Sequence, residues 1–87
     1  MASYELVFRK SVAKDLRVFP KQDVKRIMQR IRVLADDPRP SGCEKLSGQE
    51  RYRIRQGVYR IIYEIEDSRL VVLIVKVGHR RDVYRSS

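Results

Sequence analysis

The segment RYRIRQGVYRIIYEIEDSRLVVLIVKV, residues 51–77, decides the fold. It contains three runs in which β-branched and aromatic residues are frequent: Arg51–Gln56, Val58–Ile65 and Leu70–Val77. Gly57 separates the first two runs, and residues 66–69 separate the last two. Connections this short join neighbouring antiparallel strands. The segment therefore predicts an antiparallel meander.

Side chains alternate between the two faces of a strand, so each run also predicts what its two faces carry. On the middle strand, the apolar set that we expect to face the helices is Tyr59, Ile61, Tyr63 and Ile65. The opposite set is Val58, Arg60, Ile62 and Glu64. On the preceding strand, three arginines share one face: Arg51, Arg53 and Arg55. A face with so many arginines cannot be the core face, so we predict that it is the open one.

The sequence before this segment predicts one strand and two helices. In residues 4–8 the alternating residues Tyr4, Leu6 and Phe8 indicate a half-buried strand. We expect Ser11 to cap a short helix, Val12–Val18, that ends near Pro20. A longer helix is expected from Lys21 to Ala35.

The longer helix is amphipathic. Its apolar residues recur every three or four positions, at Val24, Ile27, Met28, Ile31 and Leu34. Its other face carries Lys25, Arg26, Arg30 and Arg32. Asp36-Asp37-Pro38 ends the helix, and we expect Arg39–Ser47 to form a loop.

Together these elements predict an α+β fold with the order β-α-α-β-β-β. Two N-terminal helices pack on one face of the antiparallel meander and the N-terminal strand. A length of 87 residues predicts one domain, residues 1–87. A domain of this size buries roughly 60–65% of its unfolded surface, which leaves no room for a deep cofactor pocket, so we expect no cofactor.

The charge balance indicates a polyanionic partner. The chain has 20 Lys and Arg residues against 11 Asp and Glu residues, a net charge of +9. Residues 1–50 carry 11 basic and 7 acidic side chains, and residues 51–87 carry 9 and 4, so no detachable tail explains the excess. A positive folded surface concentrates polyanions, and we favour a nucleic acid or an acidic protein over mere solubility.

Residue counts also exclude several kinds of site. Cys43 is the single cysteine and His79 the single histidine, which excludes a disulfide framework and a structural zinc site. A lone cysteine fits a reducing cytoplasm, and we expect Cys43 to be a free thiol in a loop. Residues 1–3 lead directly into strand-like sequence, so we expect no signal peptide. No apolar run approaches the ~20 residues of a membrane span.

The remaining candidates for chemistry are the arginines and the segment 77–84, which contains His79. Arginine binds phosphate oxygens through two parallel hydrogen bonds and stays charged at any working pH. Several arginines around one phosphodiester would stabilise the charge of a pentacovalent transition state. A structural role stays open for each of these residues as the alternative to a catalytic one. The arginines could simply form a solvated strand face, and His79 could be a hydrogen-bonded turn residue. We expect the tyrosines Tyr52, Tyr59 and Tyr63 to pack in the core.

Two stretches, Gly57–Ile65 and Val77–Tyr84, closely resemble the RelE/ParE family of toxins from toxin–antitoxin pairs. Residues 11–16 resemble the first helix of that family, and residues 45–48 resemble its loop before the second strand. The resemblance covers nearly the whole chain and implies the fold of RelE-like microbial ribonucleases. It favours the RelE branch, which cuts messenger RNA in the ribosomal A site. The ParE branch, which poisons DNA gyrase without cutting RNA, is the alternative, as is an RNA-binding homologue with weakened catalysis.

The resemblance also implies roles for individual residues. Arg60 matches an arginine that holds the scissile phosphate, Arg80 a second arginine near the leaving group, and Tyr84 a tyrosine that stacks on or orients the nucleotide. Arg53 and Arg55 occupy positions that are lysines in the RelE branch. Arginine cannot lose its proton as a lysine can, so we expect these two to act electrostatically while His79 or Tyr84 moves a proton.

The implied reaction is attack of a ribose 2′-OH on the adjacent phosphate. The residues expected to contact RNA are Arg51, Arg53, Arg55, Arg81, Arg26 and Arg30. The implied partners are the ribosome, messenger RNA and a RelB-like antitoxin, in a toxin–antitoxin heterotetramer. The chain ends three residues after Tyr84, so we expect the antitoxin to cover or distort the arginine face.

Overall fold

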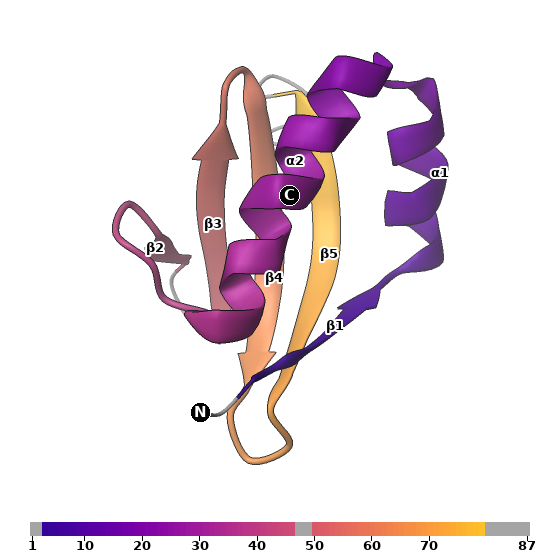
Figure 1. Ribbon diagram of the computed structural model, residues 1–87. Helices are drawn as coiled ribbons and strands as arrows, with labels where there is room; N and C mark the ends of the chain where they lie inside the picture. The colour runs from indigo at the N-terminus through magenta and orange to yellow at the C-terminus, as the bar shows by residue number, and fades with distance from the viewer. Residues whose placement is uncertain (1–2, 47–49, 80–87) are drawn as a thin grey trace.

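The computed structural model describes residues 3–46 and 50–79. The elements follow in the order β1 (Glu5–Phe8), α1 (Lys10–Val18), α2 (Lys21–Asp36), β2 (Glu44–Leu46), β3 (Arg51–Gln56), β4 (Tyr59–Glu66) and β5 (Val71–His79) (Figure 1). The predicted α+β class is confirmed, with two helices and a five-stranded sheet.

The sheet has the strand order β1-β5-β4-β3-β2. Strands β3, β4 and β5 form the predicted antiparallel meander. The N-terminal strand β1 joins the far side of β5 in parallel, so the first and last described strands are neighbours. The turn between β3 and β4 consists of Gly57 and Val58, and Gly57 has φ +60°, which glycine adopts without strain.

The predicted loop over Arg39–Ser47 is wrong in part, because residues Glu44–Leu46 form the edge strand β2. This strand pairs antiparallel with β3, with Glu44 opposite Arg53 and Leu46 opposite Arg51. Three residues are too few to show an alternating pattern. The strand exists because β3 offers it an unpaired edge.

The helices begin and end close to their predicted positions. Helix α1 starts at Lys10, two residues before the prediction, and its N-cap is Arg9 in extended conformation. Ser11 therefore lies inside the first turn, and its predicted role as a cap is wrong. Helix α2 starts at Lys21 as predicted and ends at Asp36, one residue late.

The core lies between the helices and one face of the sheet (Figure 1). Helix α2 contributes Ile27, Ile31 and Leu34 from the predicted stripe, and α1 contributes Val12. The predicted inward set of β4 is confirmed, since Tyr59, Ile61, Tyr63 and Ile65 are all buried. Tyr52 is buried beside them, with its ring 5.8 Å from that of Tyr63.

The other face of the sheet is more buried than we predicted. The register between β4 and β5 shifts after Ile62, which leaves Val75 as an extra residue in β5. Val75 packs with Ile62, Leu73 and Leu46 in a second, small apolar cluster. The prediction of an open face is therefore wrong for Arg60 and Ile62, each of which is only 7% exposed.

Two tyrosines of β4 fasten the two ends of α2. The Tyr59 hydroxyl donates a hydrogen bond to Asp23 Oδ2 at 2.7 Å, in the first turn of the helix. The Tyr63 hydroxyl donates to the Pro38 carbonyl oxygen at 2.7 Å, just beyond the end of the helix. Tyr63 is fully buried, and burial raises the pKa of its phenol, so the proton stays in place for this bond.

We predict that Tyr63→Phe destabilises the protein by about 1–2 kcal/mol, because the buried Pro38 carbonyl loses its donor. Urea unfolding measures the change. Tyr4→Phe is the matched control, because its hydroxyl bonds Asp67 in an exposed position and its loss should cost less. Equal stability of Tyr63→Phe and the wild type would contradict this role for the bond.

Candidate functional site

The pairing of β2, β3 and β4 brings four charged residues together on the face of the sheet away from α2. Arg55 lies opposite Arg60, and Arg53 lies opposite Glu44. Directly paired residues share a face, and positions two apart on a strand do so as well. Glu44, Arg53, Arg55 and Arg60 thus form one group, the arginine cluster.

Arg60 is the most enclosed member of the cluster. Its cross-strand neighbour on β5 is Gly78, which has no side chain. Its neighbour two positions along β4 is the buried Ile62. Apolar surroundings of this kind strengthen the attraction of a charge for an incoming anion, because less water screens it.

Glu44 neutralises part of the cluster. Its Oε2 accepts a hydrogen bond from Arg53 Nη2, and its Oε1 lies 4.0 Å from Arg55 Nη2. The hydrogen bond from Arg53 is the main reason that the pKa of Glu44 lies below its usual range, and the charges of Arg55 and Arg60 add to it. Among the described members of the cluster, one carboxylate faces three arginines, and this net positive charge suits a phosphodiester.

Sequence reasoning missed Glu44 because it assigned residues 39–47 to a loop. The three residues of β2 carry no alternating pattern that could have marked them as a strand. Only the pairing with β3 places Glu44 beside Arg53.

Arg51 lies on the same face but further along the sheet, opposite Glu64. Arg51 Nε donates a hydrogen bond to Glu64 Oε2 at 2.8 Å. Its guanidinium is therefore already matched with a carboxylate, and it adds little net charge to the cluster.

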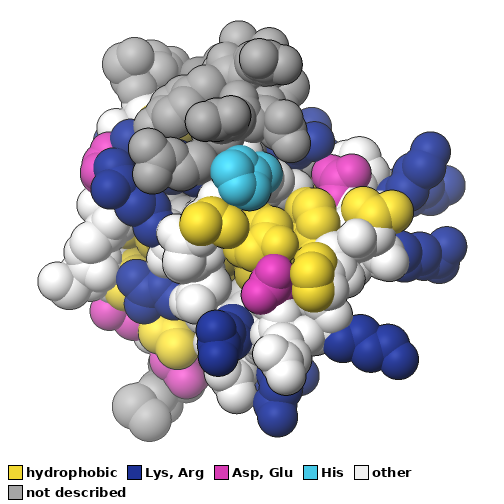
Figure 2. Space-filling model, turned by 90° about the horizontal axis from the view of Figure 1, so that it is seen from above, with side chains coloured by type: hydrophobic (Ala, Val, Ile, Leu, Met, Phe, Trp, Pro, Cys, Tyr) yellow, Lys and Arg dark blue, Asp and Glu magenta, His cyan; other side chains and the backbone are white. Residues whose placement is uncertain are grey.

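His79 lies on the other side of the sheet from the cluster. Its cross-strand partner is Tyr59, which faces the core, and the two rings meet edge to face with centroids 6.3 Å apart. Figure 2 views this end of the molecule and shows the histidine beside hydrophobic side chains, with lysines and arginines around them. The structure therefore does not bring His79 together with Arg53, Arg55 and Arg60.

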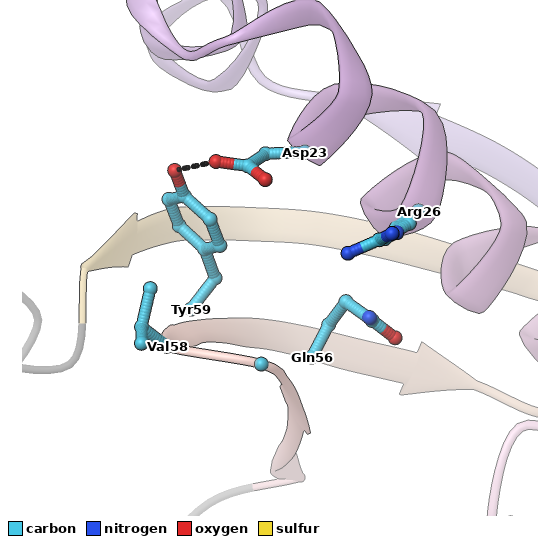
Figure 3. A pocket seen from close by; sticks show the side chains of 6 residues that line it. Asp23, Arg26, Gln56, Val58 and Tyr59 are labelled. Carbon is cyan, nitrogen blue, oxygen red and sulfur yellow. Dashed lines mark hydrogen bonds between the residues drawn. The ribbon is translucent and has the colours of Figure 1, made fainter.

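Arg26 and Arg30 of α2 also lie on the helix side of the sheet. Arg26 lines a shallow pocket between the start of α2 and the β3–β4 turn, with Asp23, Gln56 and Tyr59 (Figure 3). Arg30 lies against the loop after α2, where a Cβ atom on Gly42 would come within 3.9 Å of Arg30 Nη2. Neither residue joins the arginine cluster.

The predicted site residues Arg80, Arg81 and Tyr84 lie outside the described residues. Within residues 3–46 and 50–79, no three His, Cys, Asp or Glu side chains gather as metal ligands would. Neither helix in those ranges has the length and apolar character that crossing a membrane requires.

The chain is similar to toxins of toxin–antitoxin systems. Residues 6–84 match the model of a family described as the ParE toxin of the type II toxin–antitoxin system parDE. A segment of 34 residues is 44% identical to the toxin RelG of Mycobacterium tuberculosis, and it spans 39% of this chain and 39% of RelG.

Two solved structures share the whole fold. The archaeal RelE-RelB complex from Pyrococcus horikoshii has a chain that is 31% identical, with a TM-score of 0.82, covering 90% of this chain and 96% of that one. The RelB-RelE antitoxin-toxin complex from Methanococcus jannaschii has one that is 28% identical, with a TM-score of 0.74, covering 92% and 96%.

We predict that Arg53→Gln moves the pKa of Glu44 back up towards its usual value, because it removes the hydrogen bond that stabilises the carboxylate. Carbon-detected NMR titration of the glutamate side chains measures this pKa. The stability that the ion pair gives is present above the pKa of an unfolded glutamate, about 4.3, and is lost as the pH falls through the lower folded value. Arg69→Gln, at the distant β4–β5 turn, is the control, and an equal effect of both variants would contradict the assignment.

Proposed function

Because the chain belongs to the RelE/ParE family of toxins from toxin–antitoxin systems, we propose that it is a ribosome-dependent endoribonuclease that inhibits translation by cleaving messenger RNA in the ribosomal A site. The observation that carries the proposal is the gathering of Arg53, Arg55 and Arg60 on one face by the register of β3 and β4. A surface with excess arginine in partly apolar surroundings suits a phosphate whose negative charge increases during reaction.

In the proposed reaction the ribose 2′-OH attacks the adjacent phosphorus, and the bond to the 5′-oxygen of the next nucleotide breaks. The products are a 2′,3′-cyclic phosphate and a 5′-hydroxyl end. Arg60, the buried member, would hold the scissile phosphate, and Arg53 and Arg55 would stabilise the additional charge of the transition state. Arg80 would act near the leaving oxygen, as the family resemblance implies.

Proton transfer needs a group other than these arginines, which keep their protons at any working pH. Glu44 is a poor base, because its pKa is held below the usual range. His79 faces the helix side of the sheet. We therefore propose that Tyr84, as a phenolate, takes the proton of the attacking 2′-OH, and that water protonates the leaving 5′-oxygen. Arginines close to the phenol would lower its pKa enough for this role. Its ring would also stack on the nucleotide.

A site with one weak acid–base group needs help in positioning its substrate. The ribosome would supply that help by holding the message in a reactive geometry, and proximity of this kind removes much of a reaction barrier. Arg26, Arg30, Arg51 and Arg81 would serve as contacts to ribosomal RNA outside the arginine cluster. Such contacts are blind to sequence and weaken steeply as salt rises.

The proposed partner off the ribosome is an antitoxin. The two similar structures described above are complexes of RelE with RelB, and each contains a toxin chain with this fold. We propose that an acidic segment of a RelB-like chain covers the arginine cluster, in a toxin–antitoxin heterotetramer.

We predict that Arg60→Ala lowers the rate of messenger RNA cleavage on ribosomes by about 100–1,000-fold, by analogy with the loss of one transition-state donor. Primer extension on translated message measures the rate and the positions of the cuts. Arg60→Lys keeps the charge but loses the paired donors, so its rate should fall between those of Arg60→Ala and the wild type.

The control for charge is Arg69→Ala, which removes one exposed arginine at the far turn and should cleave as the wild type does. Thermal unfolding of each variant shows whether the fold is intact. Full cleavage by a folded Arg60→Ala protein would contradict the proposed site.

A gyrase inhibitor is the second candidate, and the match to the ParE family model favours it. It predicts intact message, inhibited gyrase and toxicity that survives Arg60→Ala. Supercoiling assays with purified gyrase, run beside the primer extension, separate the two candidates.

A further inference from the structure

Glu44 bridges two arginines in the way that a phosphate would. Its Oε2 accepts a hydrogen bond from Arg53, and its Oε1 lies 4.0 Å from Arg55 Nη2, close enough for an ion pair. A phosphate bound at this position would present the same feature, two oxygens shared between two planar cations. The carboxylate therefore occupies the place of an anion in the cluster.

The ion pair joins the mostly buried side chain of Arg53 to the more exposed side chain of Glu44. The Arg53 side chain is 16% exposed and held within the sheet, whereas the Glu44 side chain is 51% exposed. Glu44 lies on the edge strand β2, which has three residues and pairs only with β3 among the described strands. Rotation of the Glu44 side chain into water would break its hydrogen bond with Arg53.

Glu44 contributes to stability through its ion pair with Arg53 rather than through the core. The fold depends on the apolar clusters, to which β2 contributes Leu46 rather than Glu44. An ordinary glutamate is already charged near neutral pH, and the lowered pKa of Glu44 keeps its carboxylate charged at more acidic pH as well.

We propose that Glu44 is a built-in competitor of the substrate phosphate, which holds Arg53 and Arg55 in the resting protein and is displaced when a phosphodiester binds. The inference rests on the proposed function in one respect, namely that the displaced carboxylate gives way to RNA. Its consequence is selectivity. An RNA free in solution must displace Glu44 and makes few other contacts to offset that cost in free energy. A message held on the ribosome makes many such contacts.

The test uses inorganic phosphate as the probe, with the 87-residue protein. Arginine Nε–Hε resonances report the titration for the wild type and for Glu44→Gln, which keeps the shape of the side chain and removes its charge. Glu66→Gln is the matched control. Glu66 is equally exposed at 51%, pairs with Arg69, and lies six positions along β4 from Arg60.

We expect Glu44→Gln to bind phosphate about fivefold more tightly than the wild type, the size of effect that a partly exposed ion pair exerts. Glu66→Gln changes the net charge equally and should stay within about twofold of the wild type, because the two sites are about 20 Å apart along the strand. Glu44→Ala is a second variant that should change in the same direction as Glu44→Gln. Equal affinities of Glu44→Gln and Glu66→Gln, a weaker affinity of Glu44→Gln, or no phosphate binding by any variant would each overturn the proposal.

The titration does not depend on cleavage, so the two proposals fail separately. If the wild type leaves translated message intact while Glu44→Gln gains phosphate affinity, the nuclease assignment falls and the competitor role stands. If the message is cut but Glu44→Gln gains nothing, the competitor role falls and the nuclease assignment stands.

Discussion

The register between β3 and β4 is the constraint on which both the fold and the candidate site depend. It sets Tyr52 opposite Tyr63 on the core face and Arg55 opposite Arg60 on the other face. Because side chains alternate strictly along a strand, a slip of one residue would turn the arginines into the core and the tyrosines out of it. Burial of the apolar set therefore fixes the positions of the charges.

Strand β4 connects the two faces most directly. On one side, its tyrosines bond Asp23 and the Pro38 carbonyl at the two ends of α2. On the other side, Arg60 lies in the arginine cluster, two positions from Ile62. The packing that holds α2 in place thus also holds Arg60, and a binding group on a rigid strand is better positioned than one on a loop.

The sequence alone predicted the elements with strong periodicity and missed those that depend on distant partners. The alternation in β4 and the stripe of Ile27, Ile31 and Leu34 predicted the core, since each pattern repeats over several turns or residues. Strand β2 has three residues and, among the described strands, pairs only with β3. No local sequence pattern therefore predicted it. Because strand β2 was not predicted, the sequence analysis also missed Glu44, whose partner Arg53 lies nine residues further along the chain.

The side of the sheet that His79 occupies was also beyond local patterns. The shift at Val75 decides which residues of β5 face the core, and that shift follows from the pairing with β4 rather than from composition. The histidine consequently lies edge to face with Tyr59 on the helix side of the sheet, although we expected it to move a proton beside the arginines.

The central claim, that the arginine face rather than the helix face receives the message, is tested most directly by an NMR titration of the folded protein. The ligand is a short RNA with a 2′-O-methyl group at the cleavage position, which binds without reacting. The account predicts that the largest shifts fall on the side chains of Arg53, Arg55 and Arg60. Shifts confined to Arg26 and Arg30 on α2, with these three unchanged, would contradict it.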